Sequence, residues 1–258
     1  MLTNIVMNNW KPRLHAAGIH LLISVAIAAL AAALVFGLWY PYPYRELSGG
    51  RALFFMVVGI DVIMGPLITL LIFNAQKTRR HLAVDLSVVA LLQVAALCYG
   101  LWTVFEARPV HLVFEYKNMV VVHAAEIDPV TLTQAPSALQ KLPMTGPTLL
   151  SLRSFNSADE EYDSVSMALA GRAQAAQPAL WQPYEAARAN ILQTAQTLAQ
   201  LQARFPEQAS AIAQAANATG LPSAQLRTLP LLSRDLAWTV FIDAQTAQPV
   251  GYLALDSF

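Results

Sequence analysis

Hydrophobic residues are concentrated in three long stretches of the N-terminal part of the chain. They cover residues 19–39, 52–73 and 82–105, and few charged or amide side chains interrupt them. A helix needs roughly 20 residues to cross about 30 Å of hydrocarbon. The pattern therefore predicts three transmembrane helices in a membrane domain at residues 19–105, preceded by a short cytoplasmic segment at residues 1–18. Because the first stretch is longer than the apolar core of a signal peptide, we interpret it as a retained helix.

Residues 106–258 have shorter apolar runs, which are typical of a separate domain with its own core. β-Branched and aromatic runs joined by short polar segments predict hairpins, and Ser157-x-x-Glu160 predicts the start of a helix. The expected elements are a hairpin of residues 110–116 and 119–127, a proline-rich loop at 128–150, a helix from Ser157 to about Gly171, a long amphipathic helix from about Tyr184 to Arg204, an alanine-rich helix from Pro206 to about Gly220, and a hairpin of residues 237–243 and 250–255. This order predicts an extracytoplasmic α+β domain.

Composition supports a membrane protein, since 56% of the residues are hydrophobic and only 12% are charged. The net charge is zero, and no basic tract provides a surface for nucleic acid. The single cysteine, Cys98, lies in an apolar stretch, so a disulfide framework and a thiolate metal site are both excluded.

The distribution of basic residues predicts the orientation of the helices. Five lie before the first stretch or between the second and third, namely Lys11, Arg13, Lys77, Arg79 and Arg80. Only Arg45, Arg51 and Arg108 lie on the other side, where we expect them to anchor at lipid headgroups. This asymmetry favours a multi-pass protein of the bacterial inner membrane with a cytoplasmic N-terminus and a periplasmic C-terminal domain.

The link after the first stretch alternates aromatic residues with prolines, from Trp39 to Tyr44. Prolines restrict the backbone, and aromatic rings suit the headgroup zone. We expect a rigid strap at the outer membrane surface, which serves either as an ordinary interfacial belt or as a docking edge for a partner.

Asp61 is the most informative polar residue, because it lies near the middle of the second stretch. A charge at that depth costs about 2.5 to 3.5 kcal/mol even on lenient insertion scales. Gly65 and Thr69 follow at helical spacing and extend a small, polar face on which another helix can pack closely. Pro66 is expected to kink the helix beside this face.

The third stretch offers partners for this face. Gln93 lies at about the depth of Asp61, so we expect a hydrogen bond between them, and Ala96 and Gly100 extend its face for close packing. Asp85 lies one turn inside the cytoplasmic end and is expected to have a cationic or imidazole partner such as Arg80, His81 or His20. Asp61 then either fixes the register of the bundle or receives a polar group from a partner helix. Transport of a proton or solute is the weakest alternative, because three helices enclose a pathway poorly.

Candidate chemistry is sparse in the C-terminal domain. His111 and His123 would lie opposite each other if the hairpin loop has three residues, but a metal site needs a third ligand. The acidic run Asp159 to Asp163 fits a helix start better than a cation site. We find no nucleophile elbow, phosphate loop or dinucleotide motif. The sequence therefore predicts no enzyme, no cofactor and no metal.

Several motifs, taken together, resemble one protein family. They are Tyr40-Pro41-Tyr42-Pro43-Tyr44, Glu46-Leu47-Ser48-Gly49-Gly50 with Arg51 and Leu53-Phe54, Gly59-Ile60-Asp61, Gly65-Pro66-Leu67-Ile68-Thr69-Leu70, Phe73-Asn74 with Lys77, Asp85-Leu86, Gln93, the run from Ala95 to Leu101, Ala107-Arg108-Pro109-Val110 and Phe114-Glu115. Over roughly residues 36 to 127 the chain is similar to type IV pilin accessory proteins of the TfpX/TfpZ type, found in the inner membrane of bacteria that make type IV pili. It departs at Lys117-Asn118-Met119, where the family has an Asp-Arg-Phe-like step.

The resemblance implies a role in maturing, displaying or assembling pilin, or in pilus dynamics, without a known catalytic step. Our first hypothesis is a non-enzymatic accessory factor that holds pilin through its membrane helices and its periplasmic domain. The partners would then be type IV pilin or pilus assembly proteins, and the lipid bilayer. The alternatives are a membrane sensor or transporter-like protein with a periplasmic ligand-binding domain, and a membrane enzyme that modifies pilin.

Overall fold

The computed structural model describes residues 2–74, 76–234 and 236–258, with side chains from Trp10 onward. The chain forms two compact units. The first contains the residues up to Pro41 together with Gly49–Glu106, and the second contains Tyr42–Ser48 together with Ala107–Phe258. The chain therefore passes from one unit to the other three times.

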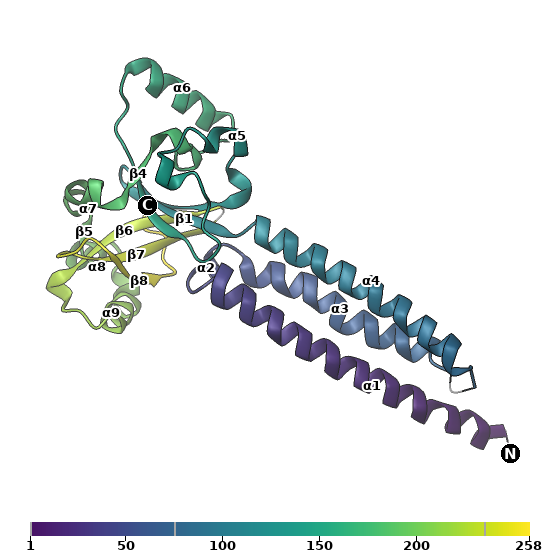
Figure 1. The fold of residues 1–258 in the computed structure, drawn as a ribbon. Coiled ribbons are helices and arrows are strands. Elements are labelled where there is room, and N and C mark those ends of the chain that lie inside the picture. Colours follow the sequence, from purple (N-terminus) through teal and green to yellow (C-terminus); the bar gives the residue numbers. More distant parts are fainter. Residues whose placement is uncertain (1, 75, 235) are drawn as a thin grey trace. The chain divides into compact units, whose positions relative to one another are not determined.

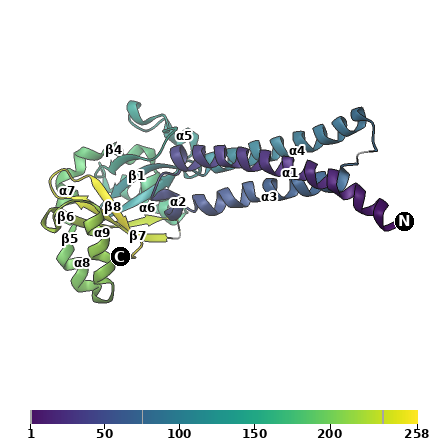
Figure 2. The same ribbon diagram turned by 90° about the horizontal axis from the view of Figure 1, so that it is seen from below.

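The first unit consists of three long helices, which run side by side in Figures 1 and 2. α1 (Leu2–Leu34) continues as a π-helical turn, Val35–Trp39, and is followed by α3 (Gly50–Ile72) and α4 (Arg79–Glu106). By length and composition, all three are apolar enough to cross a membrane. This agrees with the three helices predicted from sequence, although α1 begins within the segment 1–18 that we expected to precede it.

Large apolar side chains of this unit mostly point outward, which suits a lipid environment. Leu22, Leu71 and Leu91 are 72%, 75% and 70% exposed. A small buried cluster joins the helices at the end near the strap, and it comprises Ala31, Val35, Tyr40, Phe54, Val58 and Val104. The Tyr40 hydroxyl donates a hydrogen bond to the carbonyl of Val104, with an O···O distance of 3.2 Å.

The strap extends to Ser48, and its residues 42–48 belong to the second unit. Its short helix α2 (Tyr44–Leu47) places Tyr44 and Leu47 in that unit's core, where they are 6% and 1% exposed. The Ser48 Oγ atom lies 3.1 Å from the Oγ atom of Ser233. Residues 42–48, which the sequence led us to include in the membrane domain, are thus a structural part of the other unit.

The second unit is built on one mixed sheet of eight strands in the order β4-β3-β1-β2-β6-β7-β8, with β5 paired to β6. The strands are β1 (Pro109–Glu115), β2 (Asn118–His123), β3 (Thr148–Leu152), β4 (Trp181–Pro183), β5 (Gln196–Thr197), β6 (Leu226–Ser233), β7 (Leu236–Asp243) and β8 (Pro249–Leu253). The pairs β1–β3 and β2–β6 are parallel, and the other pairs are antiparallel.

Helices cover both faces of this sheet. They are α5 (Pro129–Leu132), α6 (Ala158–Leu169), α7 (Arg188–Thr194), α8 (Leu198–Arg204) and α9 (Ala209–Ala218). Short 3-10 segments span Ala124–Glu126, Ser137–Leu139, Gln174–Ala176, Pro178–Leu180, Tyr184–Ala187, Pro206–Gln208 and Ser223–Gln225. Alternate residues of β1 belong to different buried clusters, with Leu112 and Phe114 in one and Val113 in another, as expected for a strand buried on both faces.

The two predicted hairpins are present as the antiparallel pairs β1–β2 and β7–β8. The pairing of His111 with His123, which we considered only for a three-residue turn, does not occur: His111 lies opposite Val122, and His123 lies opposite Pro109. The reason is that the turn contains two residues, Tyr116 and Lys117, and the register shifts between Pro109 and His111.

The predicted long helix from Tyr184 to Arg204 is also wrong. The chain leaves the helix at Ala195, forms the two-residue strand β5 against β6, and begins α8 after Thr197. Thr197 and Gln200 form a capping box, in which each side chain bonds to the other residue's backbone N–H group. The motif Thr197-x-x-Gln200 was the sequence signal for this break.

The other predicted helices occur close to their expected positions. Ser157 accepts a hydrogen bond from the backbone N–H of Glu160 and so caps α6, which ends just before Gly171, where φ is +96°. Gly220, with φ of +73°, follows α9 in the same way. Glycine suits both positions because other residues rarely adopt a positive φ.

Candidate functional site: a polar network in the helical bundle

The face of α3 that contains Asp61, Gly65 and Thr69 points toward the other two helices. Gly65 and Thr69 are buried, whereas Asp61 is partly exposed. Residues spaced by four lie one above the other on a helix, so these three form a continuous strip. The strip predicted from sequence is therefore present and faces the bundle.

Three side chains, one from each helix, form a hydrogen-bonded chain across this strip. His20 of α1 places Nδ1 2.6 Å from the Thr69 hydroxyl and Nε2 2.7 Å from the Gln93 Oε1 atom. Gln93 of α4 donates through Nε2 to the backbone carbonyl of Asp61, at 3.0 Å. Because an amide oxygen only accepts, His20 must donate from Nε2, and its neutral form then accepts at Nδ1 from Thr69.

Gly65 makes room for this chain. A Cβ atom at Gly65 would overlap the Gln93 amide, whereas a Cβ atom at Gly59 of the same helix would meet no atom within 4 Å. Gly100 of α4 plays a similar part, since a Cβ atom there would overlap Val57. Close packing at Gly65 and Gly100 was predicted from the sequence, but the central role of His20 was not.

The predicted contact between Asp61 and Gln93 occurs through the backbone carbonyl of Asp61 and not through its carboxylate. Asp61 lines a cavity of about 120 Å³ together with residues that include His20, Ser24 and Gln93. Asp61 also lines a groove of about 410 Å³ between α3 and α4, which extends to Asp85 and, apart from these two residues and Gln93, is lined by apolar side chains. Within the described part of the chain, no hydrogen bond or ion pair involves the Asp61 carboxylate.

Asp85 has a cationic partner, as expected, but the partner is Lys77. The Lys77 ammonium donates to the Asp85 carboxylate at 2.6 Å. His20, which we considered for Asp85, is instead engaged by Thr69 and Gln93. Pro66 lies within α3, which continues as an α-helix through it, and Arg51 lies in the first turn of the same helix.

Arg108, which we expected at the lipid headgroups, belongs to the second unit and is only 5% exposed. Its guanidinium donates to the Pro143 carbonyl from Nε at 3.3 Å and from Nη2 at 3.1 Å. Arg108 therefore fixes the proline-rich segment that follows the first hairpin.

The histidines of the second unit have structural partners. His111 contacts the Thr148 hydroxyl at 2.8 Å and packs edge-on against Trp181, and burial lowers its pKa to about 4. His123 contacts Glu126 at 2.9 Å. Among the described residues, no group of three metal-ligating side chains could hold an ion.

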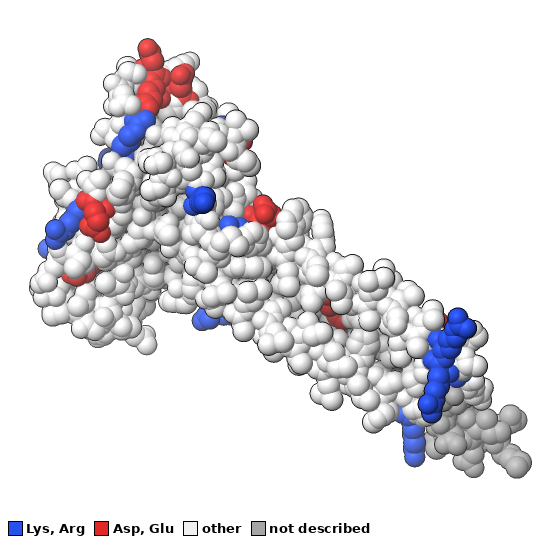
Figure 3. Space-filling model, viewed as in Figure 1, with Lys and Arg blue, Asp and Glu red and all other residues white. Residues whose placement is uncertain are grey.

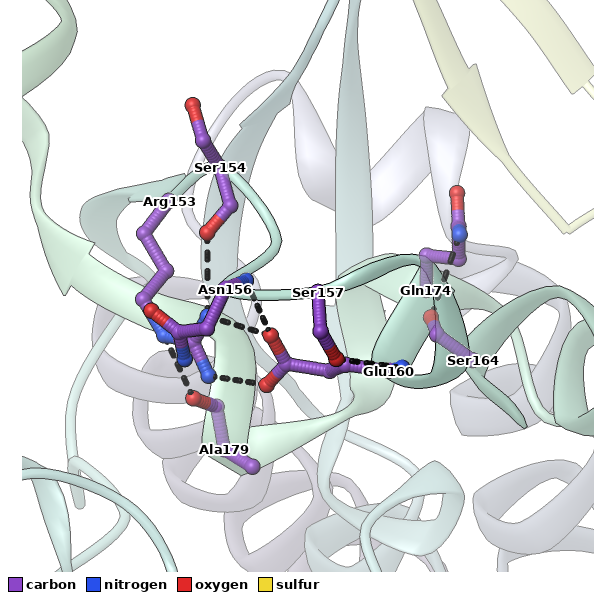
Figure 4. A network of polar contacts seen from close by, with 8 residues as sticks. All are labelled: Arg153, Ser154, Asn156, Ser157, Glu160, Ser164, Gln174 and Ala179. Atoms are coloured by element: carbon purple, nitrogen blue, oxygen red, sulfur yellow. Dashed lines mark hydrogen bonds and ion pairs between the residues drawn. The ribbon is translucent and has the colours of Figure 1, made fainter. Parts of the chain in front are cut away.

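Arg153 and Glu160 form a network at the start of α6 that the sequence did not indicate (Figure 4). Arg153 donates to both Glu160 carboxylate oxygens, at 3.1 and 2.5 Å, and to the Ala179 carbonyl at 3.2 Å. The backbone N–H of Asn156 also donates to Glu160. These contacts with Arg153 and Asn156 lower the pKa of Glu160 to about 2. The Glu160 carboxylate therefore stabilises the start of α6, and it is already paired with Arg153.

Comparison with known proteins finds relatives that are all described as fimbrial assembly proteins. Residues 8–49 match the family described as fimbrial assembly protein FimB. The chain is 36% identical over 232 residues to a fimbrial assembly protein of serogroup I from Dichelobacter nodosus, which covers 88% of this chain and 89% of the relative. It is 34% identical to the serogroup E1 protein of the same organism, again over 88% of this chain and 89% of the relative. No solved structure matches the chain.

Proposed function

The chain belongs to the family of fimbrial assembly proteins, and from this premise we propose that it is a non-enzymatic membrane accessory factor in the biogenesis of type IV pili, of the TfpX/TfpZ type. The observation that supports this most directly is the similarity to fimbrial assembly proteins over nearly nine-tenths of the chain. The three apolar helices are consistent with a membrane protein. The proposal includes no catalytic step.

We propose further that the bundle holds the hydrophobic helix of pilin in the groove between α3 and α4. The sequence suggested the strip of Asp61, Gly65 and Thr69 as the contact surface. In the structure, however, Gln93 packs against Gly65, and His20 is hydrogen-bonded to Thr69. Asp61 remains available at the edge of the groove, whose walls are apolar over most of their length. In a lipid environment, a carboxylate beside such a groove favours a partner helix that brings a polar group to it.

The proposed location is the inner membrane, with the second unit in the periplasm. The support is the placement of Arg79 and Arg80 at the start of α4, with Lys77 just before it. Figure 3 shows Lys and Arg side chains, in blue, near one end of the helices, while most of the visible helical surface lacks charged side chains. Reporter fusions that become active only in the periplasm would show activity at residue 258 and none at residue 76.

The decisive experiment combines gene deletion with crosslinking in cells that make pili. Deletion should reduce surface piliation and twitching motility while leaving the chemical modification of pilin unchanged. Photo-crosslinkers at Met64, Ile68 and Leu92, which line the groove, should capture pilin. Leu91, which is 70% exposed but does not line the groove, serves as the control position.

The outcomes separate the role in pilus biogenesis from the groove as the binding surface and from an enzymatic role. Normal piliation after deletion would contradict a role in pilus biogenesis. Loss of piliation with equal crosslinking from Leu91 and the groove positions would contradict only the groove as the binding surface. A change in pilin modification would favour the enzymatic alternative.

A further inference from the structure

α6 presents its apolar side chains to solvent, which is unusual for a helix of a folded domain. Tyr162, Val165 and Leu169 are 73%, 42% and 86% exposed. Their spacing of three and four residues places them on one line along the helix. A helix of twelve residues thus exposes a continuous hydrophobic seam.

The helix is anchored through its polar side. Ser164 is 2% exposed, accepts a hydrogen bond at its hydroxyl from Gln174 at 3.1 Å, and accepts another at its carbonyl from Gln177 at 3.0 Å. At the N-terminus, the Ser157 cap and the ion pair between Arg153 and Glu160 hold the first turn (Figure 4). The exposed seam is therefore presented by a helix that is fixed at its start and along its inner side.

Acidic residues flank the seam on both sides. Asp159 and Asp163, four residues apart, lie along one side, and Glu161 lies along the other. All three are exposed, and Figure 3 shows acidic side chains gathered over α6. Glu160 is excluded from this set because Arg153 neutralises it. The surface thus combines an apolar line with negative edges.

We propose that this α6 seam, defined by Tyr162, Val165 and Leu169, docks onto an amphipathic helix of another protein whose flanking positions carry lysine or arginine. Apolar anchors at positions i, i+3 and i+7 are the recurrent pattern of helix recognition, and charges beside the seam select the partner. A second copy of this chain would bring acidic edges together, which opposes self-association. A lipid surface is disfavoured as well, because helices that lie on membranes are rich in basic residues.

This inference concerns the C-terminal unit and does not depend on the groove between α3 and α4. It is tested first with defined probes and the full-length protein in nanodiscs of zwitterionic lipid. The probes are two synthetic helical peptides with the same leucine seam, one flanked by lysine and the other by glutamate. We expect the lysine peptide to bind roughly tenfold more tightly, and added salt to reduce the difference.

Variants identify the surface. Replacing Tyr162, Val165 and Leu169 together by serine should abolish binding, and Asp159→Lys with Asp163→Lys should reverse the preference between the peptides. Glu207→Lys, at an exposed acid outside α6, is the matched control and should leave binding unchanged. Thermal unfolding of each variant verifies the fold. Equal binding of both peptides, or binding that survives the triple serine variant, overturns the proposal.

Crosslinking in cells then tests the partner class. Photo-crosslinkers at positions 162, 165 and 169 should form adducts with a single protein segment. Mass spectrometry gives the sequence of this segment, which should have apolar residues at helical spacing flanked by lysine or arginine. Val130, which is 75% exposed on α5, is the control position and should not form this adduct. Adducts with lipid, with a second copy of this chain, or with a segment without basic flanks would each contradict the proposal.

Discussion

Gly65 is the residue at which α3 leaves space for a side chain of α4. A Cβ atom there would overlap the Gln93 amide, and Gln93 in turn connects His20 to the backbone of Asp61. Gly65→Ala should therefore displace Gln93 and destabilise the bundle by about 1 to 3 kcal/mol, the usual cost of overpacking. Thermal unfolding in one detergent measures this change.

The matched control for that substitution is Gly59→Ala, on the same helix, where an added methyl group meets no atom within 4 Å. It shares any effect of removing a glycine from α3 but adds no overlap. Equal unfolding temperatures for the two variants would show that Gly65 is not the point of close approach.

His111 is expected to make the second unit sensitive to acid. Burial lowers the pKa of His111 from 6.5 to about 4. At a pH between these two values, His111 is therefore protonated in the unfolded chain and neutral in the folded chain. The contribution of His111 to stability is complete above pH 6.5 and is lost as the pH falls toward 4, and it is on the order of 3 kcal/mol. Unfolding temperatures of the parent and of His111→Gln, measured between pH 7.5 and 4.5, should converge as the pH falls.

The carboxylates of the protein also titrate in this range, but they are common to both proteins and cancel in the difference. Parallel curves for the parent and the variant would show that the protonation of His111 does not affect folding.

At the scale of elements, the break before α8 illustrates how a local signal competes with a periodic pattern. The apolar spacing of residues 184–204 favours one helix, yet the capping box of Thr197 and Gln200 starts a new helix and β5 pairs with β6. Thr197→Ala removes the cap and should lower the free energy of unfolding by about 1 kcal/mol. Thr197→Ser retains a capping hydroxyl and should behave like the parent in thermal unfolding. A variant pair with identical stability would mean that the tertiary contacts of β5 suffice to end α7.

The elements predicted correctly from sequence are those defined by neighbouring residues. The hairpins β1–β2 and β7–β8 join strands close in sequence, and α6 and α9 have a cap or a terminating glycine. By contrast, β6 was missed because it contains Pro230, a residue that disfavours a central strand, and because its pairing with β2 joins residues far apart in sequence. The short strand β3 begins in the predicted proline-rich loop, β4 has only three residues and ends at Pro183, and the pairing of both strands likewise depends on long-range contacts.

The same distinction applies to the polar network. Helical spacing was enough to place Asp61, Gly65 and Thr69 on one strip and to bring Gln93 opposite them. The hydrogen bonds of His20 depend on the rotation of α1 about its own axis, which the nearly uniform apolar sequence of that helix does not define. Estimating depth alone therefore made His20 one of the candidate partners of Asp85, whose partner is Lys77.

At the scale of the whole molecule, the chain enters the second unit twice, first with residues 42–48 and again at Ala107. Residues 42–48 leave the helical unit, supply Tyr44 and Leu47 to the core of the other unit, and return to α3. Leu47→Ala should cost about 2 to 5 kcal/mol, because a fully buried leucine leaves a cavity. Limited proteolysis should then cleave the second unit of this variant faster, even though the substitution lies between two apolar helices in sequence. An unchanged cleavage rate would indicate that the strap is dispensable for that unit.

A disulfide can test both the packing of the strap and the compartment of the second unit. The Oγ atoms of Ser48 and Ser233 lie 3.1 Å apart, although the residues are 185 positions apart in sequence. In a Cys98→Ser background, Ser48→Cys with Ser233→Cys should therefore form a crosslink in cells if the second unit lies in the oxidising periplasm. Gel mobility without reductant detects the closed loop, and Ser48→Cys with Ser223→Cys is the control pair.

The packing of the strap and the orientation of the second unit can be contradicted separately. If the crosslink forms only after the purified protein is oxidised, the strap packs as described but the second unit lies in a reducing compartment, which contradicts the proposed orientation. If it forms under neither condition while the control pair does, the strap does not pack against β6. The first result would also contradict the proposed orientation of the groove between α3 and α4, because the Asp85 end of the groove would then face the periplasm rather than the cytoplasm.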